Sequence, residues 1–222
     1  MSAAPLVSLN GIGVSFGRTA ALREVSLDLD EGVTGLFGPN ASGKTTLLRV
    51  LAGLLRPTSG TVSVLGRPLS AKDEAQRGRI GYVGHSSGLY GRLSVVENLE
   101  LFARLYGVRG RVPELLERLG LNGRATTPAV DLSAGFRRRA AVARALLHEP
   151  DLLLLDEPYA NLDDEASELV SLAIMDWRAP GRCAVVATHG AKKVKRYADT
   201  GVILQHGRVI RRGTYEATGF TT

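Results

Sequence analysis

One loop constrains the fold of this chain more than any other feature. Residues 38–45 read Gly-Pro-Asn-Ala-Ser-Gly-Lys-Thr, which matches the spacing G-x-x-x-x-G-K-[ST]. The loop follows an apolar run at 33–37, typical of a strand, and precedes a helical pattern at 44–52. In that setting the glycines let backbone N–H groups converge on phosphate oxygens, and the helix N-terminus adds its positive dipole end. The loop therefore predicts an α/β fold that binds a nucleotide through these residues: Gly38, Pro39, Asn40, Ala41, Ser42, Gly43, Lys44, Thr45 and Thr46.

Two acids end a second buried strand. Residues 152–155 are all leucine, as expected of an inner strand of a parallel sheet, and Asp156 and Glu157 follow directly. Ligands bind at the carboxyl ends of such strands, which places both acids beside the phosphate loop unless they are merely solvated turn residues. We expect Thr45 and Asp156 to hold Mg²⁺, while Lys44 reaches the β- and γ-phosphates. Glu157 is then the general base toward an attacking water.

His189 ends a third apolar strand, at 184–188, and is expected at the same edge of the sheet. From that position it could contact the γ-phosphate and orient the water. A lone histidine is more often structural, so its position alone leaves both readings open.

The hydrophobic pattern elsewhere predicts a core and an insertion. Alternating residues near the start predict separate strands at 6–9, 14–16 and 25–29. From about residue 86 the pattern becomes helical, beginning with a Ser-x-x-Glu capping box. We expect a single domain over 1–222, with a mixed-sheet α/β nucleotide-binding core and a helical subdomain. The expected ranges are 1–85 and 148–222 for the core and 86–147 for the subdomain.

Composition excludes several other classes of protein. Aromatic residues make up only 5% of the chain, too few for a platform that stacks single-stranded nucleic acid. The single cysteine, Cys183, excludes an internal disulfide or a thiolate-based zinc site. No apolar run approaches the roughly 18 residues of a membrane span, and the start lacks a signal-peptide pattern, which favours a cytosolic protein. The net charge of +6 comes mainly from scattered arginines, which favours solvated faces over a nucleic-acid partner.

Further motifs give the chain a family resemblance. Residues 132–136 read Leu-Ser-Ala-Gly-Phe, which is similar to the Leu-Ser-Gly-Gly-Gln signature of ATP-binding-cassette (ABC) ATPases. Residues 161–163 resemble that family's loop after the catalytic glutamate, and Thr188-His189 resembles its switch-histidine motif. Phe16 stands where the family places an aromatic ring on the adenine. The resemblance covers nearly all of the chain.

The resemblance implies a P-loop NTPase core, with additional N-terminal antiparallel strands and an inserted α-helical subdomain. It also implies that ATP and Mg²⁺ are the cofactors and that the protein hydrolyses ATP. Two subunits, expected to be a homodimer, would sandwich two ATP between the phosphate loop of one and the signature of the other. They would drive integral membrane permease subunits from the cytoplasmic face of the membrane. The additional nucleotide-binding residues implied are Phe16, Ser133, Gly135 and Asp163, and His189 gains a catalytic role beside Glu157.

The sequence also departs from the family pattern. His85, after Gly84, stands where the family has a glutamine that touches Mg²⁺, so His85 is a candidate metal ligand or else a surface residue. Ala134 and Phe136 replace a glycine and the glutamine of the signature. Gly84-His85 and the Ala134 form of the signature both resemble the ATP-binding subunit of the haem exporter of cytochrome c maturation, so haem export is the first expectation. The alternatives are another small exporter, of lipid, drug or polysaccharide, and a non-transport ABC ATPase.

Overall fold

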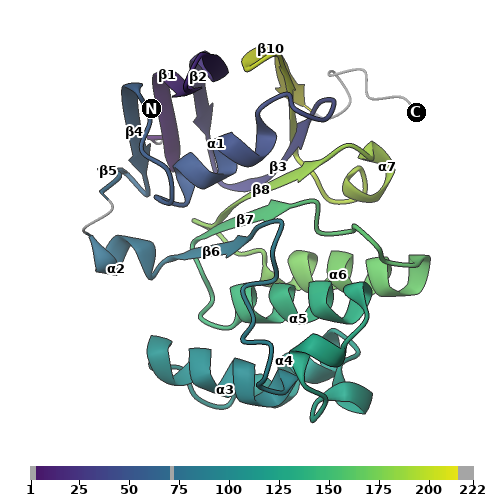
Figure 1. Cartoon of the computed structure of the whole chain (residues 1–222). Helices are drawn as coiled ribbons and strands as arrows, with labels where there is room; N and C mark the ends of the chain where they lie inside the picture. The colour runs from purple at the N-terminus through teal and green to yellow at the C-terminus, as the bar shows by residue number, and fades with distance from the viewer. Residues whose placement is uncertain (1–3, 71–72, 215–222) are drawn as a thin grey trace.

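A computed structural model describes residues 4–70 and 73–214, which form two sheets and their covering helices (Figure 1). The strands are β1 (Val7–Phe16), β2 (Thr19–Leu29), β3 (Gly32–Phe37), β4 (Ser59–Val64), β5 (Arg67–Pro68), β6 (Ile80–Val83), β7 (Leu152–Asp156), β8 (Cys183–Thr188), β9 (Thr200–Gln205) and β10 (Arg208–Thr214). The α-helices are α1 (Lys44–Leu51), α2 (Glu74–Arg77), α3 (Val95–Tyr106), α4 (Arg111–Arg118), α5 (Ala134–Leu146), α6 (Asp164–Trp177) and α7 (Ala191–Val194). Two 3₁₀ turns, at Asn122–Arg124 and Ala129–Asp131, lie between α4 and α5.

The smaller sheet is antiparallel, with the order β2-β1-β4-β5. The prediction of separate strands at 6–9 and 14–16 was wrong, because β1 runs without interruption through Asn10 and Gly11. Gly11 adopts a left-handed conformation (φ +60°), and the pairing register with β2 shifts between Leu9 and Ile12. The Asn-Gly pair therefore marks an irregularity within a strand rather than a turn between two strands.

The larger sheet is mixed, with the order β10-β9-β3-β8-β7-β6. Its inner pairs, from β9 through β3, β8 and β7 to β6, are parallel, and β10 alone is antiparallel to its neighbour β9. All four leucines of β7 are 0% exposed, because helices cover both faces of this strand. The expected mixed-sheet α/β core is confirmed.

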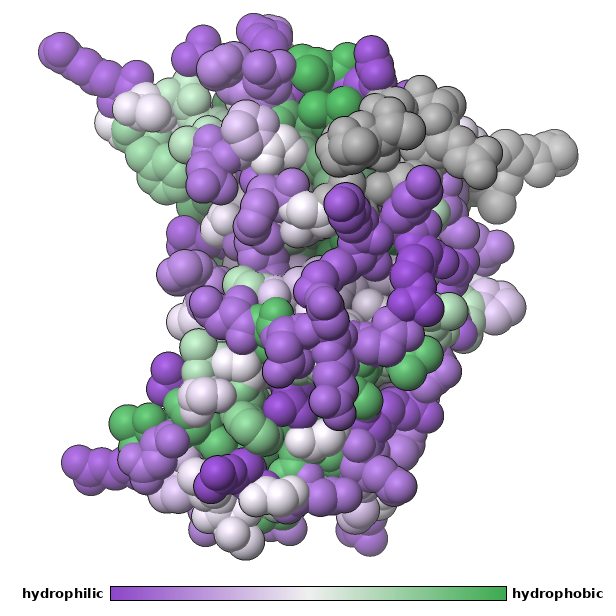
Figure 2. Space-filling view, turned by 90° about the vertical axis from the view of Figure 1, so that its right-hand side faces the viewer, coloured by the Kyte–Doolittle hydropathy of each residue, from purple (hydrophilic) through white to green (hydrophobic). Residues whose placement is uncertain are grey.

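Two hydrophobic clusters hold the layers together. One cluster lies between the two sheets and encloses the apolar side of α1. The other lies on the opposite face of the larger sheet, against α5, α6 and the more distant α3 and α4 (Figure 1). The face shown in Figure 2 is mainly hydrophilic, and its apolar side chains gather in separate groups near the top and the bottom of the view.

The helical segment between β6 and β7 begins as the capping box predicts. The Ser94 hydroxyl accepts from the Glu97 N–H at 3.3 Å, and Glu97 Oε2 accepts from the Ser94 N–H at 2.8 Å. The Ser94 N–H, together with the Ser94 hydroxyl, which donates to the same Oε2 at 2.7 Å, lowers the pKa of the Glu97 carboxyl. Within the described residues, no helix has the length and apolar character needed to cross a bilayer.

Candidate functional site

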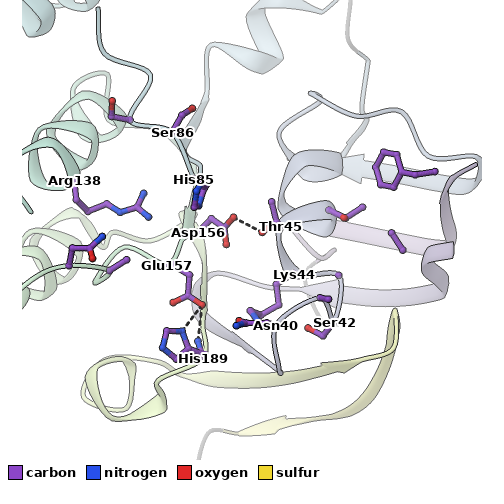
Figure 3. A pocket seen from close by; sticks show the side chains of 18 of the residues that line it. Asn40, Ser42, Lys44, Thr45, His85, Ser86, Arg138, Asp156, Glu157 and His189 are labelled. Atoms are coloured by element: carbon purple, nitrogen blue, oxygen red, sulfur yellow. Dashed lines mark hydrogen bonds and ion pairs between the residues drawn. The ribbon is translucent and has the colours of Figure 1, made fainter. Parts of the chain in front are cut away.

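A cleft of about 870 Å³ opens where the phosphate loop meets the carboxyl ends of β7 and β8. Figure 3 shows side chains from the loop, from the segment after β6 and from α5 pointing into it. The predicted residues that line the cleft are Phe16, Asn40, Ala41, Ser42, Gly43, Lys44, Thr45, Thr46, His85, Asp156, Glu157 and His189. The fold thus brings together groups up to 173 positions apart, from Phe16 at the end of β1 in the antiparallel sheet to His189 after β8 in the larger sheet.

The phosphate loop needs glycine at two positions. Gly38 has φ +147°, and a Cβ there would lie 2.0 Å from the Leu204 carbonyl oxygen. Gly43 has φ +108°, and a Cβ there would lie 2.7 Å from the Ala21 carbonyl oxygen. Lys44 is buried, and its ammonium donates to the carbonyl oxygens of Gly38 (2.7 Å) and Pro39 (3.1 Å). The Lys44 ammonium therefore places a positive charge over the phosphate loop, close to the N-terminus of α1.

Thr45 and Asp156 meet across the cleft. The Thr45 hydroxyl donates to Asp156 Oδ2 at 2.7 Å, although the two residues come from α1 and β7. A hydroxyl and a carboxylate placed together are hard oxygen donors, the type that Mg²⁺ prefers alongside water and phosphate oxygens. The residues present therefore fit the predicted magnesium site.

Glu157 is held in a fixed orientation at the rim of the cleft. Its Oε2 accepts from the Thr188 hydroxyl at 3.1 Å, and its Oε1 accepts from the His189 N–H at 3.0 Å. His189 Nδ1 also lies 3.0 Å from Oε1, which suits a ring protonated at Nδ1. The Glu157 backbone is left-handed (φ +50°) and is tied by its N–H to the Ala187 carbonyl oxygen at 2.8 Å. Such strained non-glycine residues cluster at functional sites.

The opposite end of the cleft is formed by the turn between β1 and β2. Phe16 ends β1 and is 51% exposed, with its ring available to a flat ligand. Thr19, Ala20 and Ala21 line the same end, which sequence reasoning had not identified. No motif marks these three residues, because their contribution is a shape made by the start of β2.

Some predicted residues lie outside this cleft. Gly38 and Pro39 line a neighbouring cavity of about 900 Å³ that shares Glu157 and His189 with it. Ser133, Gly135 and Asp163 are not among the lining residues of either cavity.

These last three residues begin helices. Ser133 caps α5 by accepting from the Phe136 N–H at 3.3 Å, and Asp163 caps α6 by accepting from the Ala166 N–H at 2.7 Å. A Cβ on Gly135 would lie 3.0 Å from the Asn161 carbonyl oxygen, so the start of α5 touches the loop that precedes α6.

The arginine run at 137–139 is not the solvated patch that its composition suggests. Arg138 and Arg139 are 9% and 8% exposed. Arg138 Nη1 donates to the Gly84 carbonyl oxygen at 2.7 Å, directly before His85, and burial lowers the pKa of Arg138. Its guanidinium points toward His85 and Asp156 (Figure 3). Arg138 and Arg139 stand directly before the alanines of α5, on the face that packs inward, and this sequence signal was missed.

Comparison with known proteins identifies the family. The ABC transporter family model matches residues 22–160. Nod factor export ATP-binding protein I of Cupriavidus pinatubonensis is 36% identical over 214 residues, which cover 94% of this chain and 66% of that protein. The ABC transporter ATP-binding protein NatA of Bacillus subtilis is 35% identical over 204 residues, which cover 89% of this chain and 83% of that protein. This chain thus spans about two thirds of the Nod factor protein's length.

Solved structures agree. An ATP-binding subunit of an ABC transporter has a TM-score of 0.87 and 29% identity, covering 96% of this chain and 91% of that one. The ATP-binding cassette MJ0796, solved as a post-hydrolysis dimer with ADP and Pi, has a TM-score of 0.83 and 28% identity, covering 94% and 98%. The phosphate loop, the fold and these relatives together show that the chain belongs to the ABC transporter family, as one of its ATP-binding cassette ATPases.

Proposed function

We propose that the chain is the ATP-hydrolysing motor of a small ABC exporter, working as a pair of identical subunits at the cytoplasmic face of a membrane. The observation that carries the proposal is the anchored Glu157 carboxylate, which faces a phosphate loop in a cleft of nucleotide size. A module that only binds nucleotide has no need of a strained, oriented carboxylate at that point.

In this proposal Glu157 accepts the proton of the water that attacks the γ-phosphorus. The Thr188 hydroxyl and the His189 N–H fix its two oxygens, so the carboxylate does not reorient when the proton arrives. His189, mostly exposed, turns its remaining ring edge toward the cleft and positions the γ-phosphate. Lys44 offsets the negative charge of the β- and γ-phosphates.

Thr45 and Asp156 would hold Mg²⁺, with His85 as a further candidate ligand. When bound, the ion would offset the negative charge of the phosphates. The 2.7 Å contact between the Thr45 hydroxyl and Asp156 Oδ2 supports this pairing, and His85 lines the same cleft.

The pairing of two subunits is supported by the residues that the cleft does not use. Ser133 and Gly135 begin α5, whose N-terminal amides favour an anion, yet neither lines the cleft of its own chain. We propose that this helix start, in a signature subdomain at 86–147, binds the phosphates held by a second copy. Asp163, beside the touching Asn161 loop, would then lie at the interface between copies.

The cargo is the finer part of the proposal. The expectation of haem export rests on two motifs, Gly84-His85 and the Ala134 form of the signature. The relatives reported above are instead a Nod factor export ATP-binding protein and the ABC transporter ATP-binding protein NatA. Neither name mentions haem, and the first favours the alternative expectation, another small exporter, of lipid, drug or polysaccharide. Permease subunits in the membrane would select that cargo.

The test is Glu157→Gln, with Glu117→Gln on the exposed side of α4 as the matched control. Glu157→Gln should slow hydrolysis by roughly 10²–10⁴-fold while ATP still binds and the protein elutes as a dimer with ATP and Mg²⁺. Glu117→Gln should hydrolyse ATP at the wild-type rate. Undiminished turnover in Glu157→Gln would refute the assignment of the base. Capture of membrane proteins on the ATP-loaded Glu157→Gln dimer would then separate the haem exporter's permeases from those of another exporter.

A further inference from the structure

We propose that Arg138 is a positioning residue that fixes the Gly84-His85 segment to α5, so that His85 and the signature end of α5 move as one unit. The inference rests on the proposed function, because it concerns how His85 is presented to the phosphates and Mg²⁺. It concerns a residue that neither the motifs nor the family match singles out.

The first support is the contact itself. Arg138 lies on α5, is 9% exposed, and donates from Nη1 to the Gly84 carbonyl oxygen at 2.7 Å. A charged donor to a buried carbonyl makes a stronger hydrogen bond than a neutral one. The acceptor is the residue directly before His85, whose own side chain is exposed in the cleft. The pairing of β6 with β7 ends at Val83, so the guanidinium restrains the backbone at the next residue, directly before His85.

A second arginine on the same helix extends the attachment. Arg144 Nη2 donates to the Tyr82 carbonyl oxygen at 2.8 Å, two residues before Gly84. A Cβ on Gly88 would lie 3.3 Å from the Arg144 guanidinium, so the segment also passes close to α5 beyond His85. The two arginines are six positions apart and bind alternate carbonyls at the end of β6, so the strand end and the helix form one rigid unit.

The third support is charge. Asp156 and Glu157 are close enough to stabilise the cationic form of Arg138, although burial is the larger influence and lowers its pKa. Arg138 lines the cleft with both acids and with His85 (Figure 3). An arginine suits this place because its planar fork can hold a carbonyl while presenting a permanent positive charge to the cleft.

The consequence is a link between the start of α5 and the Gly84-His85 segment. Ser133 caps the helix five positions before Arg138, about 7.5 Å along the axis at 1.5 Å per residue. If a second copy's nucleotide is held at Ser133, any displacement of the helix start is transmitted through Arg138 to His85 in this copy's own cleft. This makes His85 responsive to the partner's nucleotide as well as to its own.

A double-mutant cycle on kcat separates positioning from plain stability. Arg138→Gln should lower kcat by about tenfold, because the Gly84-His85 segment moves. The KM for ATP should change by less than about twofold, because the phosphate loop keeps its position. In a His85→Ala background the same substitution should cost less than about twofold, since the residue that it positions is already gone. Arg138→Lys, which retains the charge and one donor, should recover part of the loss.

Hydrogen exchange of the nucleotide-free protein gives a readout without catalysis. Arg138→Gln should speed exchange of the amides of residues 80–83, which pair with β7 and lead into the Gly84 contact, by about tenfold or more, with α5 unchanged. Arg137→Gln is the matched control, because this neighbour donates to the Val130 carbonyl oxygen and not to the loop. It should leave exchange at 80–83 as in the wild type.

The outcomes are distinct. Equal losses of kcat in both backgrounds, or unchanged exchange at 80–83 in Arg138→Gln, would overturn the positioning role. If Arg138→Gln does not fold, Arg138→Lys goes through the same cycle and the same exchange measurement. A wild-type chain without ATPase activity would refute the proposed function, and the exchange measurement would still decide whether Arg138 holds the loop.

Discussion

Lowering the pH should destabilise this fold through His148, at the end of α5. The ring is largely buried and stacks on Tyr106, with 4.0 Å between ring centroids and 11° between planes. Burial lowers the pKa of His148 from 6.5 to about 4, and the nearby Arg144 charge acts in the same direction. Between these two values the unfolded chain binds a proton that the native chain does not, so stability falls as the pH falls through that window.

The size of the effect follows from the two pKa values. Between about pH 7 and about pH 5, the lowered pKa of His148 reduces the free energy of unfolding by about 2 kcal/mol at most. Solvent screening at the exposed edge of the ring brings this loss down to about 1 kcal/mol. For a chain of this length, 1 kcal/mol moves the thermal midpoint by about 2–4 °C.

His148→Phe isolates this contribution, because a phenyl ring keeps the stack on Tyr106 and cannot bind a proton. Urea unfolding at about pH 7 and about pH 5, at constant ionic strength, measures the loss of stability in each protein. The wild type should lose about 1–2 kcal/mol more than His148→Phe over this interval. The reasoning is refuted if both proteins lose the same amount, or if the variant loses more.

Three other changes test different parts of the structure. Lys44→Ala should weaken ATP binding by about tenfold or more, measured by titration with a fluorescent nucleotide, because the phosphates lose a buried cation. The buried Asn98 side chain is 0% exposed; it accepts from the Tyr90 N–H and donates to the carbonyl oxygens of Tyr90, Leu93 and Ser94. Asn98→Ala should therefore lower the free energy of unfolding in urea by about 3 kcal/mol, and a loss under about 1 kcal/mol would contradict a structural role for these hydrogen bonds. Chelation of Mg²⁺ by EDTA should abolish phosphate release yet leave nucleotide binding detectable, and activity that persists would rule out a metal requirement.

The fold was predictable where local chemistry and periodicity agree. The phosphate loop, the all-leucine strand β7 and the capping box before α3 each carry a pattern that one structure satisfies. The pairing of β1 was not predictable in the same way, because an Asn-Gly pair suits both a turn and a bulge. Tertiary pairing with β2 and β4 on both sides of β1 decided between them.

The site was predictable for residues whose position follows from topology. Asp156, Glu157 and His189 end parallel strands, so the shared edge of the sheet brings them together without further information. Arg138 could not be assigned in this way, because its role depends on which face of α5 packs inward and on the carbonyl it meets there. A run of three arginines carries no such information by itself.

The departure at Phe136 has a structural explanation that bears on the signature. Phe136 packs against the hydrophobic cluster under α5, and its ring lies 4.3 Å from the Arg139 guanidinium. Arg139 in turn donates to the carbonyl oxygens of Leu119 and Gly120 at 2.6 and 2.8 Å, just after α4. The aromatic ring therefore helps to join α4 to α5 inside the helical segment. Because this replacement acts on the inward side of the helix, the N-terminal amides proposed to bind the partner's phosphates keep their position, and the departure from glutamine does not argue against hydrolysis in a dimer.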